Sequence, residues 1–476
     1  MNVSYVALWL LLLVSGPASD PPRQQPGKEL LAEGDKLADA AKYTEALLKY
    51  KLAYEKILPE LRGLKFRESV TPEFMERSAL QEHMKKLFHE DTPDEEIELM
   101  EASLKAFGFV PPEFKTEETL LQLYAEEVAG FYDPKRKEIF LIKETETPKK
   151  PGVLSRLFGA KGGFDKDEQK STLSHEMAHA LADQNFDLEK MEKAAEKDDD
   201  RSLALQALIE GEATLVMMID MQRAAGADAK EMLHASPAAM DASFKLMQGL
   251  MPFAAGKAFR TAPPIFRESM LFGYLKGMVF LLHLTNENEW ESVNKAFRKP
   301  PLSTEQVLHP EKYLKGEDEP IAIELPDLGD LLGDDWKSLG ENVLGELQIS
   351  ILLRKHWGSL AAAGWGGDRY AVFKGPDGKR GLVWFTTWDT LDDAKEFAGA
   401  YARFLGTRLG TADARPVGKD ERTPPAVPDL VQIEHEGRVY EVIRRDKDVL
   451  TVEGFTAKES KKLAEAAFKA EKKPKE

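Results

Sequence analysis

Two histidines and a glutamate lie close together in the run His175-Glu176-Met177-Ala178-His179. Apolar residues flank this run at helical spacing, so we expect it to lie on one helix. Residues four apart share a helix face, and both imidazoles could therefore bind one tetrahedral Zn²⁺. Glu176 lies one step round the helix, where its carboxylate could reach a water bound to that ion. The run thus supplies two metal ligands and a base, which is the chemistry of hydrolysis by a metal-activated water.

The same five residues would also fit an amphipathic helix whose histidines are surface residues or satisfied core residues. A zinc site of this kind needs a third protein ligand, and the chain offers a candidate. Residues 202–224 are apolar on nearly all sides and predict a buried helix, yet Glu210 lies in the middle of them. A buried carboxylate is costly unless it is paired or bound to a metal. We therefore expect Glu210 to be the third ligand.

Two other carboxylates compete with Glu210 for this role. Glu212 is about 200° further round the same helix, so the two cannot bind the same ion. Whichever of them is not the ligand would form a buried ion pair. Asp183 follows His179 by four residues and lies on the ligand face. It could be a ligand itself, or it could accept the second ring N–H of a ligand histidine.

The H-E-x-x-H run followed by a glutamate on a second helix resembles the gluzincins, the thermolysin-like zinc metallopeptidases. The resemblance implies one Zn²⁺ per chain on His175, His179 and Glu210, with Glu176 as general base for peptide-bond hydrolysis. Thirty residues separate His179 from Glu210, which exceeds the usual gap, and the charged stretch 189–200 would account for it as a solvated insertion.

The wider chain resembles a group of poorly characterised bacterial exported proteins with peptidase-like cores. The segments that carry this resemblance are 175–188, 210–214, 364–370 and 388–389.

A gluzincin also needs a donor to the oxyanion of the tetrahedral intermediate. The segment 272–277, Phe-Gly-Tyr-Leu-Lys-Gly, resembles the Y-x-K-G motif of the aminopeptidase-N-like gluzincins, which implies that Tyr274 is this donor. His309 is a competing donor, and Tyr274 fits equally well as a core tyrosine of a helix at 270–284. No exopeptidase motif of the G-x-M-E-N type is present, so aminopeptidase specificity is not expected. The strand expected at 138–142 would be the sheet edge that pairs with an extended substrate, as in other zincins.

The composition restricts the class of protein. The chain has 476 residues and a formal net charge of −17, which argues against nucleic acid as a partner. It has no cysteine, so disulfides, a lipoprotein anchor and cysteine-based zinc sites are excluded, and metal ligands must be His, Asp or Glu. The partner we expect is a peptide or protein substrate; the oligomeric state stays open.

The N-terminus predicts export. Val6–Val14 is apolar, and the small residues Gly16 and Ala18 suit a cleavage site, so 1–18 reads as a signal peptide. The apolar stretch is shorter than the ~20 residues of a membrane span, and we expect no stable span after cleavage. No Lys or Arg precedes it, which leaves an uncleaved N-terminal anchor as the alternative. The expected location is periplasmic or extracellular.

The remaining pattern predicts an α+β fold that is predominantly helical. Residues 19–65 form a helical hairpin that resembles one tetratricopeptide repeat, through Gly34, Tyr43, Ala46, Tyr50, Ala53 and Pro59. We expect a zincin-like core with a small edge sheet at 66–313, in which 72–107 is helical and the loop 143–168 flanks the cleft. A linker and helix at 314–363, a C-terminal α+β unit at 364–470 and a disordered Lys-rich tail at 471–476 complete the chain.

Two other functions fit the same sequence. The first is a non-catalytic exported binding module with a structural or vestigial zinc site, although a structural site has no need of Glu176. The second is a metal-dependent hydrolase that acts on a bond other than the peptide bond. A substrate panel at fixed zinc concentration would separate these from a peptidase.

Overall fold

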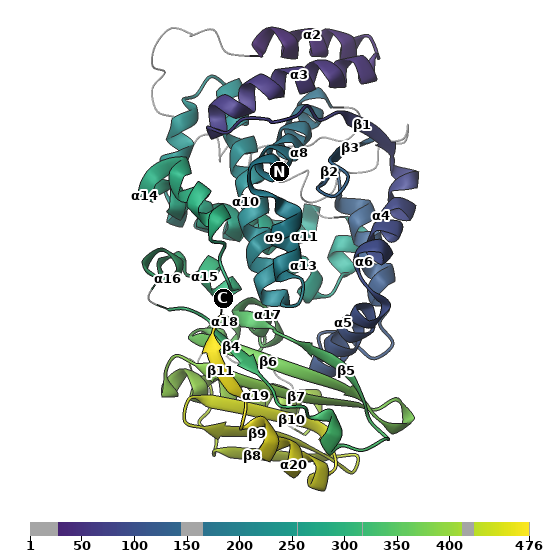
Figure 1. Ribbon diagram of the computed structural model, residues 1–476, viewed down its shortest axis with the longest axis vertical. Coiled ribbons are helices and arrows are strands. Elements are labelled where there is room, and N and C mark those ends of the chain that lie inside the picture. Colours follow the sequence, from purple (N-terminus) through teal and green to yellow (C-terminus); the bar gives the residue numbers. More distant parts are fainter. Residues whose placement is uncertain (1–26, 144–164, 255, 317, 412–422, 476) are drawn as a thin grey trace.

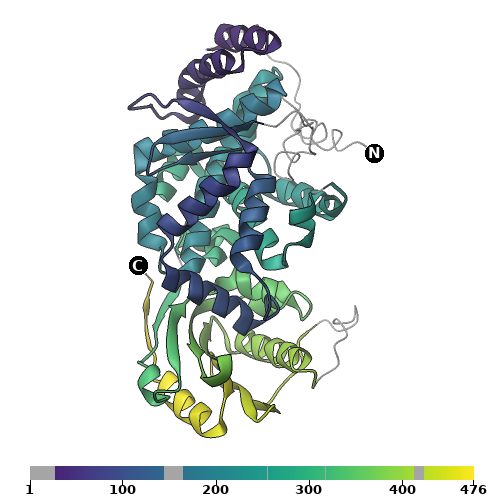
Figure 2. The ribbon, with the colours of Figure 1, turned by 90° about the vertical axis from the view of Figure 1, so that its right-hand side faces the viewer.

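The computed structural model describes residues 27–143, 165–254, 256–316, 318–411 and 423–475. The expected signal peptide and nearly all of the expected loop at 143–168 lie outside these residues. The fold is α+β and mostly helical, which confirms the predicted fold class. It has three levels in Figures 1 and 2: a helical hairpin, a helical middle part with a small sheet, and a C-terminal part built on a larger sheet.

The hairpin consists of α2 (Lys28–Asp39) and α3 (Tyr43–Arg62). The two helices touch at Gly34, where a Cβ atom would lie 2.4 Å from Cε1 of Tyr50. Glycine is therefore required for this approach. Apolar residues of α3 form one core with α8 of the middle part, so the hairpin is packed onto the rest of the molecule.

The small sheet contains three strands in the order β1-β3-β2: β1 (Pro72–Glu76), β3 (Glu138–Lys143) and β2 (Gly130–Asp133). This corrects two expectations. The start of the region expected to be helical is β1, because these residues pair in parallel with β3. The strand expected at the sheet edge, β3, is central, because β1 covers its outer side. The edge next to α8 is therefore β2, antiparallel to β3.

The long helix α10 (Asp199–Ala224) runs through the middle part and packs against α8 (Lys166–Phe186) and α14 (Gly277–Arg298). By length and composition α10 is apolar enough to span a membrane, but 72% of its most apolar window is buried inside the fold. Its apolar character is that of a core helix. The other elements of this part are α4 (Arg77–Asp91), α5 (Asp94–Phe107), α6 (Thr116–Glu127), α9 (Leu188–Ala195), η1 (Ala229–His234), α11 (Pro237–Ala254), α12 (Lys257–Thr261), α13 (Pro264–Leu271) and η2 (Phe272–Lys276).

The charged stretch 189–200 is not wholly a solvated insertion. It forms α9 and the first turn of α10, and its last residue, Asp200, is fully buried. The Asp200 carboxylate accepts hydrogen bonds from the backbone N–H (2.9 Å) and the hydroxyl (2.6 Å) of Thr304. Buried polar groups need such partners, and here they fix the start of α10 to the segment that leads into the C-terminal part.

The C-terminal sheet has six antiparallel strands in the order β5-β6-β7-β10-β9-β8. Their side chains alternate between two faces. One face packs on α19 (Leu391–Arg408) and the other on α20 (Ala457–Ala467). The strands are β5 (Lys337–Asn342), β6 (Trp365–Lys374), β7 (Arg380–Trp388), β8 (Leu430–His435), β9 (Arg438–Arg445) and β10 (Asp448–Phe455). The remaining elements are α15 (Thr304–Leu308), α16 (Pro310–Lys315), β4 (Ile321–Glu324), η3 (Gly329–Leu331), α17 (Gly345–Leu352), α18 (Gly358–Ala362), η4 (Pro376–Gly378) and β11 (Glu471–Pro474).

Two boundaries of the C-terminal unit differ from those expected. The unit begins before residue 364, because β5 pairs with β6 and belongs to the sheet rather than to a linker. The tail expected to be disordered contains β11, which pairs with β4. Its Lys475 is buried, with its ammonium 2.8 Å from Asp198 and 3.5 Å from Asp200. Composition predicted a solvated tail, whereas pairing with the distant strand β4 and ion pairs with Asp198 and the buried Asp200 order it.

Candidate metal centre

The helix α8 carries the H-E-x-x-H run and begins at a strong N-cap. The Asp165 carboxylate accepts hydrogen bonds from the backbone N–H groups of Asp167 (2.9 Å) and Glu168 (3.3 Å). The second half of the helix is buried, and His175 and His179 are each only 8% exposed. The capped helix therefore holds both imidazoles at fixed positions inside the fold.

His175, His179 and Glu210 come together across α8 and α10. The two Nε2 atoms are 3.1 Å apart, and Oε2 of Glu210 is 3.2 Å from Nε2 of His175 and 3.5 Å from Nε2 of His179. Ligands at 2.0–2.1 Å from a tetrahedral zinc lie about 3.3 Å from one another. The three atoms thus form a triangle of the size that zinc requires, and two imidazoles with one carboxylate are ligands that zinc accepts.

A close contact between α10 and α14 brings Glu210 and Tyr274 to the same place. A Cβ at Gly211 would lie 2.4 Å from the carbonyl carbon of Gly277, and a Cβ at Gly277 would lie 2.1 Å from the carbonyl oxygen of Ala207. Only glycine permits this approach of two backbones. The glycine after Glu210 and the glycine that ends the Tyr274 motif therefore meet each other.

The three candidate ligands are coupled electrostatically. Burial opposes ionisation of Glu210, but His179 and His175 outweigh it and hold the pKa of this carboxyl well below its usual value. Burial lowers the pKa of His179, but the Glu210 carboxylate outweighs that effect and raises the pKa to about 9. Without a metal the cluster therefore retains a proton at neutral pH, which a bound cation would displace.

Glu176 lies beside this cluster and is 6% exposed. Burial raises the pKa of its carboxyl, while the charges of His175 and His179 act in the opposite direction and leave a net increase. The backbone N–H of Tyr132 on β2 also acts on this carboxylate. A raised pKa makes the carboxylate a stronger base, which suits a general base beside a candidate metal cluster.

The two expected oxyanion donors lie in different places. The ring of Tyr274 stacks on His175, with centroids 6.0 Å apart, and its hydroxyl interacts with Glu210. Burial and the charges of Glu210 and Glu176 raise the pKa of Tyr274 well above its usual value, so the hydroxyl keeps its proton. His309 instead lies 2.9 Å from Glu346 and is not among the residues that line the cavity of the cluster.

The competing carboxylates also lie elsewhere. Asp183 accepts hydrogen bonds from the Tyr132 hydroxyl (2.6 Å), the Lys137 ammonium (2.6 Å) and the Leu188 backbone N–H (3.0 Å). It therefore connects α8 to the hairpin between β2 and β3, and it fixes no ligand histidine. Glu212 pairs with Arg62 of α3 at 2.5 Å, and both side chains are almost completely buried.

A cavity of about 550 Å³ contains the cluster. His175, Glu176, His179, Glu210 and Tyr274 all line it. The edge strand β2 lines it too, through Gly130, Phe131 and Tyr132. Sequence reasoning missed this strand as the edge and missed Tyr124, whose pKa is raised by burial and by the charge of Glu210. The aromatic pair Phe131-Tyr132 before the turn at 133–134 predicts a strand, but nothing in the run indicates that it is an edge strand.

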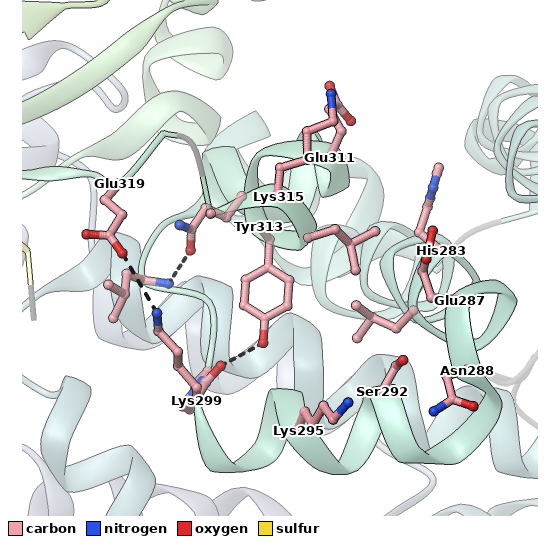
Figure 3. A pocket seen from close by; sticks show the side chains of 16 residues that line it. His283, Glu287, Asn288, Ser292, Lys295, Lys299, Glu311, Tyr313, Lys315 and Glu319 are labelled. Atoms are coloured by element: carbon pink, nitrogen blue, oxygen red, sulfur yellow. Dashed lines mark hydrogen bonds and ion pairs between the residues drawn. The ribbon is translucent and has the colours of Figure 1, made fainter.

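Two other polar regions do not form comparable sites. A larger cavity of about 710 Å³ lies beside α14 and α16, where the Tyr313 hydroxyl donates to the carbonyl of Lys299 (2.7 Å) (Figure 3). Within the described ranges, the one further group of three potential ligands is Glu305, Asp318 and Asp389. The ammonium of Lys312 lies among them, 2.7 Å from Glu305 and 2.9 Å from Asp389, and supplies the cation itself.

Comparison with known proteins adds little to this geometry. A family described as a domain of unknown function (DUF8575) matches residues 334–464, less than a third of the chain. This match agrees with a C-terminal unit that begins shortly before β5. No curated protein and no solved structure matches the chain.

Proposed function

We propose that this protein is a zinc-dependent metallopeptidase of the gluzincin type, with His175, His179 and Glu210 as the ligands. One observation carries the proposal: three ligand atoms form a zinc-sized triangle in a cavity that also contains a buried carboxylate and a protonated tyrosine. A structural zinc site would need neither Glu176 nor an adjoining cavity.

The chain's own residues then have separate roles. A zinc ion on these ligands would lower the pKa of a water to about 7 and polarise the scissile carbonyl. Glu176 accepts the proton of the attacking water and passes it to the leaving amine. The Tyr274 hydroxyl, held in its protonated form, donates to the oxyanion. The outward backbone groups of β2 orient an extended peptide beside them.

The test is Glu176→Gln, which keeps the size of the side chain and removes the base. We expect about one zinc per chain in both proteins and a fall in peptide hydrolysis of about 10²–10⁴-fold in the variant. Metal analysis and a peptide-library assay on protein without residues 1–18 measure both quantities. Full activity in the variant would remove Glu176 as the base, and absence of zinc from the supplemented wild type would contradict the proposal.

The expected partner is a peptide or protein outside the cytoplasm. This part of the proposal rests on the N-terminal sequence, since residues 1–26 lie outside the described ranges. Secretion and cleavage after Ala18 can be measured by mass spectrometry of the mature protein.

A further inference from the structure

The cavity extends well beyond the metal cluster, along one face of α10. The residues of α10 that line it follow helical spacing: Asp199, Ser202, Leu203, Gln206 and Glu210. Asp199 and Glu210 are eleven residues apart, which at 1.5 Å per residue is about 16 Å. The cavity therefore runs from the cluster to the N-terminal end of α10, a span of about five residues of extended polypeptide at ~3.3 Å per residue.

Partly exposed apolar side chains form much of the wall of this cavity. They come from five separate segments: Met84 and Phe88, Met100 and Phe109, Leu120, Phe131, and Phe266 and Met270. Core residues would be buried, so these side chains present apolar surface to the cavity, which favours an apolar ligand. The three methionines are flexible and polarisable, and can adapt to side chains of different shape.

The far end of the cavity is closed by the C-terminal unit. Leu344, Gln348 and Tyr370 line it there. Asn342 on β5 fixes the start of α10 to this unit. Its side-chain oxygen accepts from the Asp199 N–H (2.9 Å), and its amide donates to the Asp199 carboxylate (2.8 Å). The domain of unknown function thus supplies the end wall of the candidate active site.

The edge strand β2 favours polypeptide as the occupant over a lipid chain. Along this strand, the backbone N–H and C=O groups of successive residues point alternately toward β3 and away from it. Those of Ala129 point toward β3, because its carbonyl accepts a hydrogen bond from the N–H of Ile142 (2.8 Å). The backbone groups of Gly130 and Tyr132 therefore point away from β3, toward the side where α8 lies. The N–H of Tyr132 already acts on the Glu176 carboxylate, and an extended peptide can pair with the other backbone groups of this edge, which an acyl chain cannot do.

We propose that the cavity binds an extended segment of unfolded polypeptide through bulky apolar side chains of varied shape, and that the C-terminal unit sets how far this segment reaches. The proposal deepens the proposed function and rests on it for the position of the scissile bond. Gln348, on the end wall, is a specificity-determining residue for the side chain furthest from the cluster.

Binding to Glu176→Gln tests this without turnover. Fluorescently labelled peptides of increasing length, containing Leu, Phe or Met, are compared with Ser- and Gly-substituted peptides by anisotropy. We expect each bulky residue within the cavity to strengthen binding about tenfold, with similar gains for Leu, Phe and Met, up to about five residues. Equal affinity of the apolar and the substituted series would overturn the proposal.

Substitutions of residues that line the cavity test where the peptides bind. Gln348→Trp should weaken binding of the longest apolar peptides about tenfold and leave the short ones unchanged. Met270→Glu, which puts a charge on the cavity wall, should weaken binding of the long and the short peptides alike. The control Leu246→Glu puts the same charge on a residue of α11 that is 70% exposed, and should weaken neither. An equal response of Met270→Glu and Leu246→Glu, both folded, contradicts the cavity as the binding site.

Hydrolysis by the wild type separates this inference from the proposed function. Length-dependent apolar binding without any cleavage would leave the inference standing and reject the peptidase. Cleavage without apolar preference would reject the inference and keep the peptidase.

Discussion

The two sides of α10 each carry a buried glutamate, and the two have different surroundings. Glu210 faces a cavity and two imidazoles, and those of His179 and His175 lower the pKa of its carboxyl. Glu212 lies in the buried interface with the N-terminal hairpin and pairs with Arg62, whose guanidinium also lies 4.5 Å from the ring centre of Trp290. One carboxylate is left open to an external cation, and the other receives its cation from the chain.

The contrast teaches that the partner, rather than the residue type, decides the role of a buried carboxylate. The group of Glu305, Asp318 and Asp389 follows the same rule, since Lys312 lies among its three carboxylates. A cluster with an internal cation contributes to stability, whereas a cluster that lacks one and opens on a cavity is a candidate for metal binding.

The largest expected effect is on stability, on the side of α10 where Glu212 packs against the N-terminal hairpin. Arg62→Ala leaves Glu212 as a buried charge without a partner and should lower the free energy of unfolding by about 3–5 kcal/mol. Denaturant titration followed by circular dichroism measures the change. The control is Lys49→Ala, which breaks an exposed ion pair with Glu33 and should leave the free energy of unfolding nearly unchanged. Equal losses of unfolding free energy in the two variants would contradict the role of Arg62 as the partner of a buried Glu212 charge.

The second effect is on zinc affinity, on the side of α10 where Glu210 faces the cavity. Glu210→Ala removes a ligand and should weaken zinc binding by at least about 100-fold, since loss of an outer-shell partner alone costs 10–100-fold. Competition with a chromogenic chelator measures the affinity. Glu212→Gln is the matched variant, because it changes a neighbouring glutamate on the other side of the helix and should keep the zinc affinity. Unchanged affinity in Glu210→Ala would show that Glu210 is not a ligand.

The smallest effect is the pH dependence of zinc binding. The pKa of His179 is raised to about 9 in the metal-free protein, so below pH 9 this imidazole carries a proton that zinc must displace. Apparent affinity should therefore rise with pH, by at most about tenfold per unit for this one proton, and level off near pH 9. Isothermal titration in buffers of different ionisation enthalpy counts the protons released. A pH-independent affinity between pH 7 and 9 would be inconsistent with the His179–Glu210 coupling.

Local patterns predicted most of the C-terminal unit. Alternation predicts strands at 370–373, 382–386, 431–434, 439–443 and 449–452, and helical spacing predicts helices at 390–409 and from 456. The strands β6 to β10 and the helices α19 and α20 lie at these places. These signals suffice because each element pairs with or packs on a neighbour that is close in sequence. The strands that were missed, β1, β4, β5 and β11, all pair with strands that turn signals alone do not connect to them.

The sequence by itself determined the chemistry that the centre offers: two imidazoles four residues apart on one helix, a carboxylate between them, and no cysteine. Helical spacing fixes these relations without reference to the rest of the chain. Only the tertiary structure decided which glutamate joins them, because the choice between Glu210 and Glu212 depends on where α3, α8 and α14 pack around α10. It also decided that β2 is the edge strand and that the C-terminal unit closes the cavity, since both follow from contacts between distant segments.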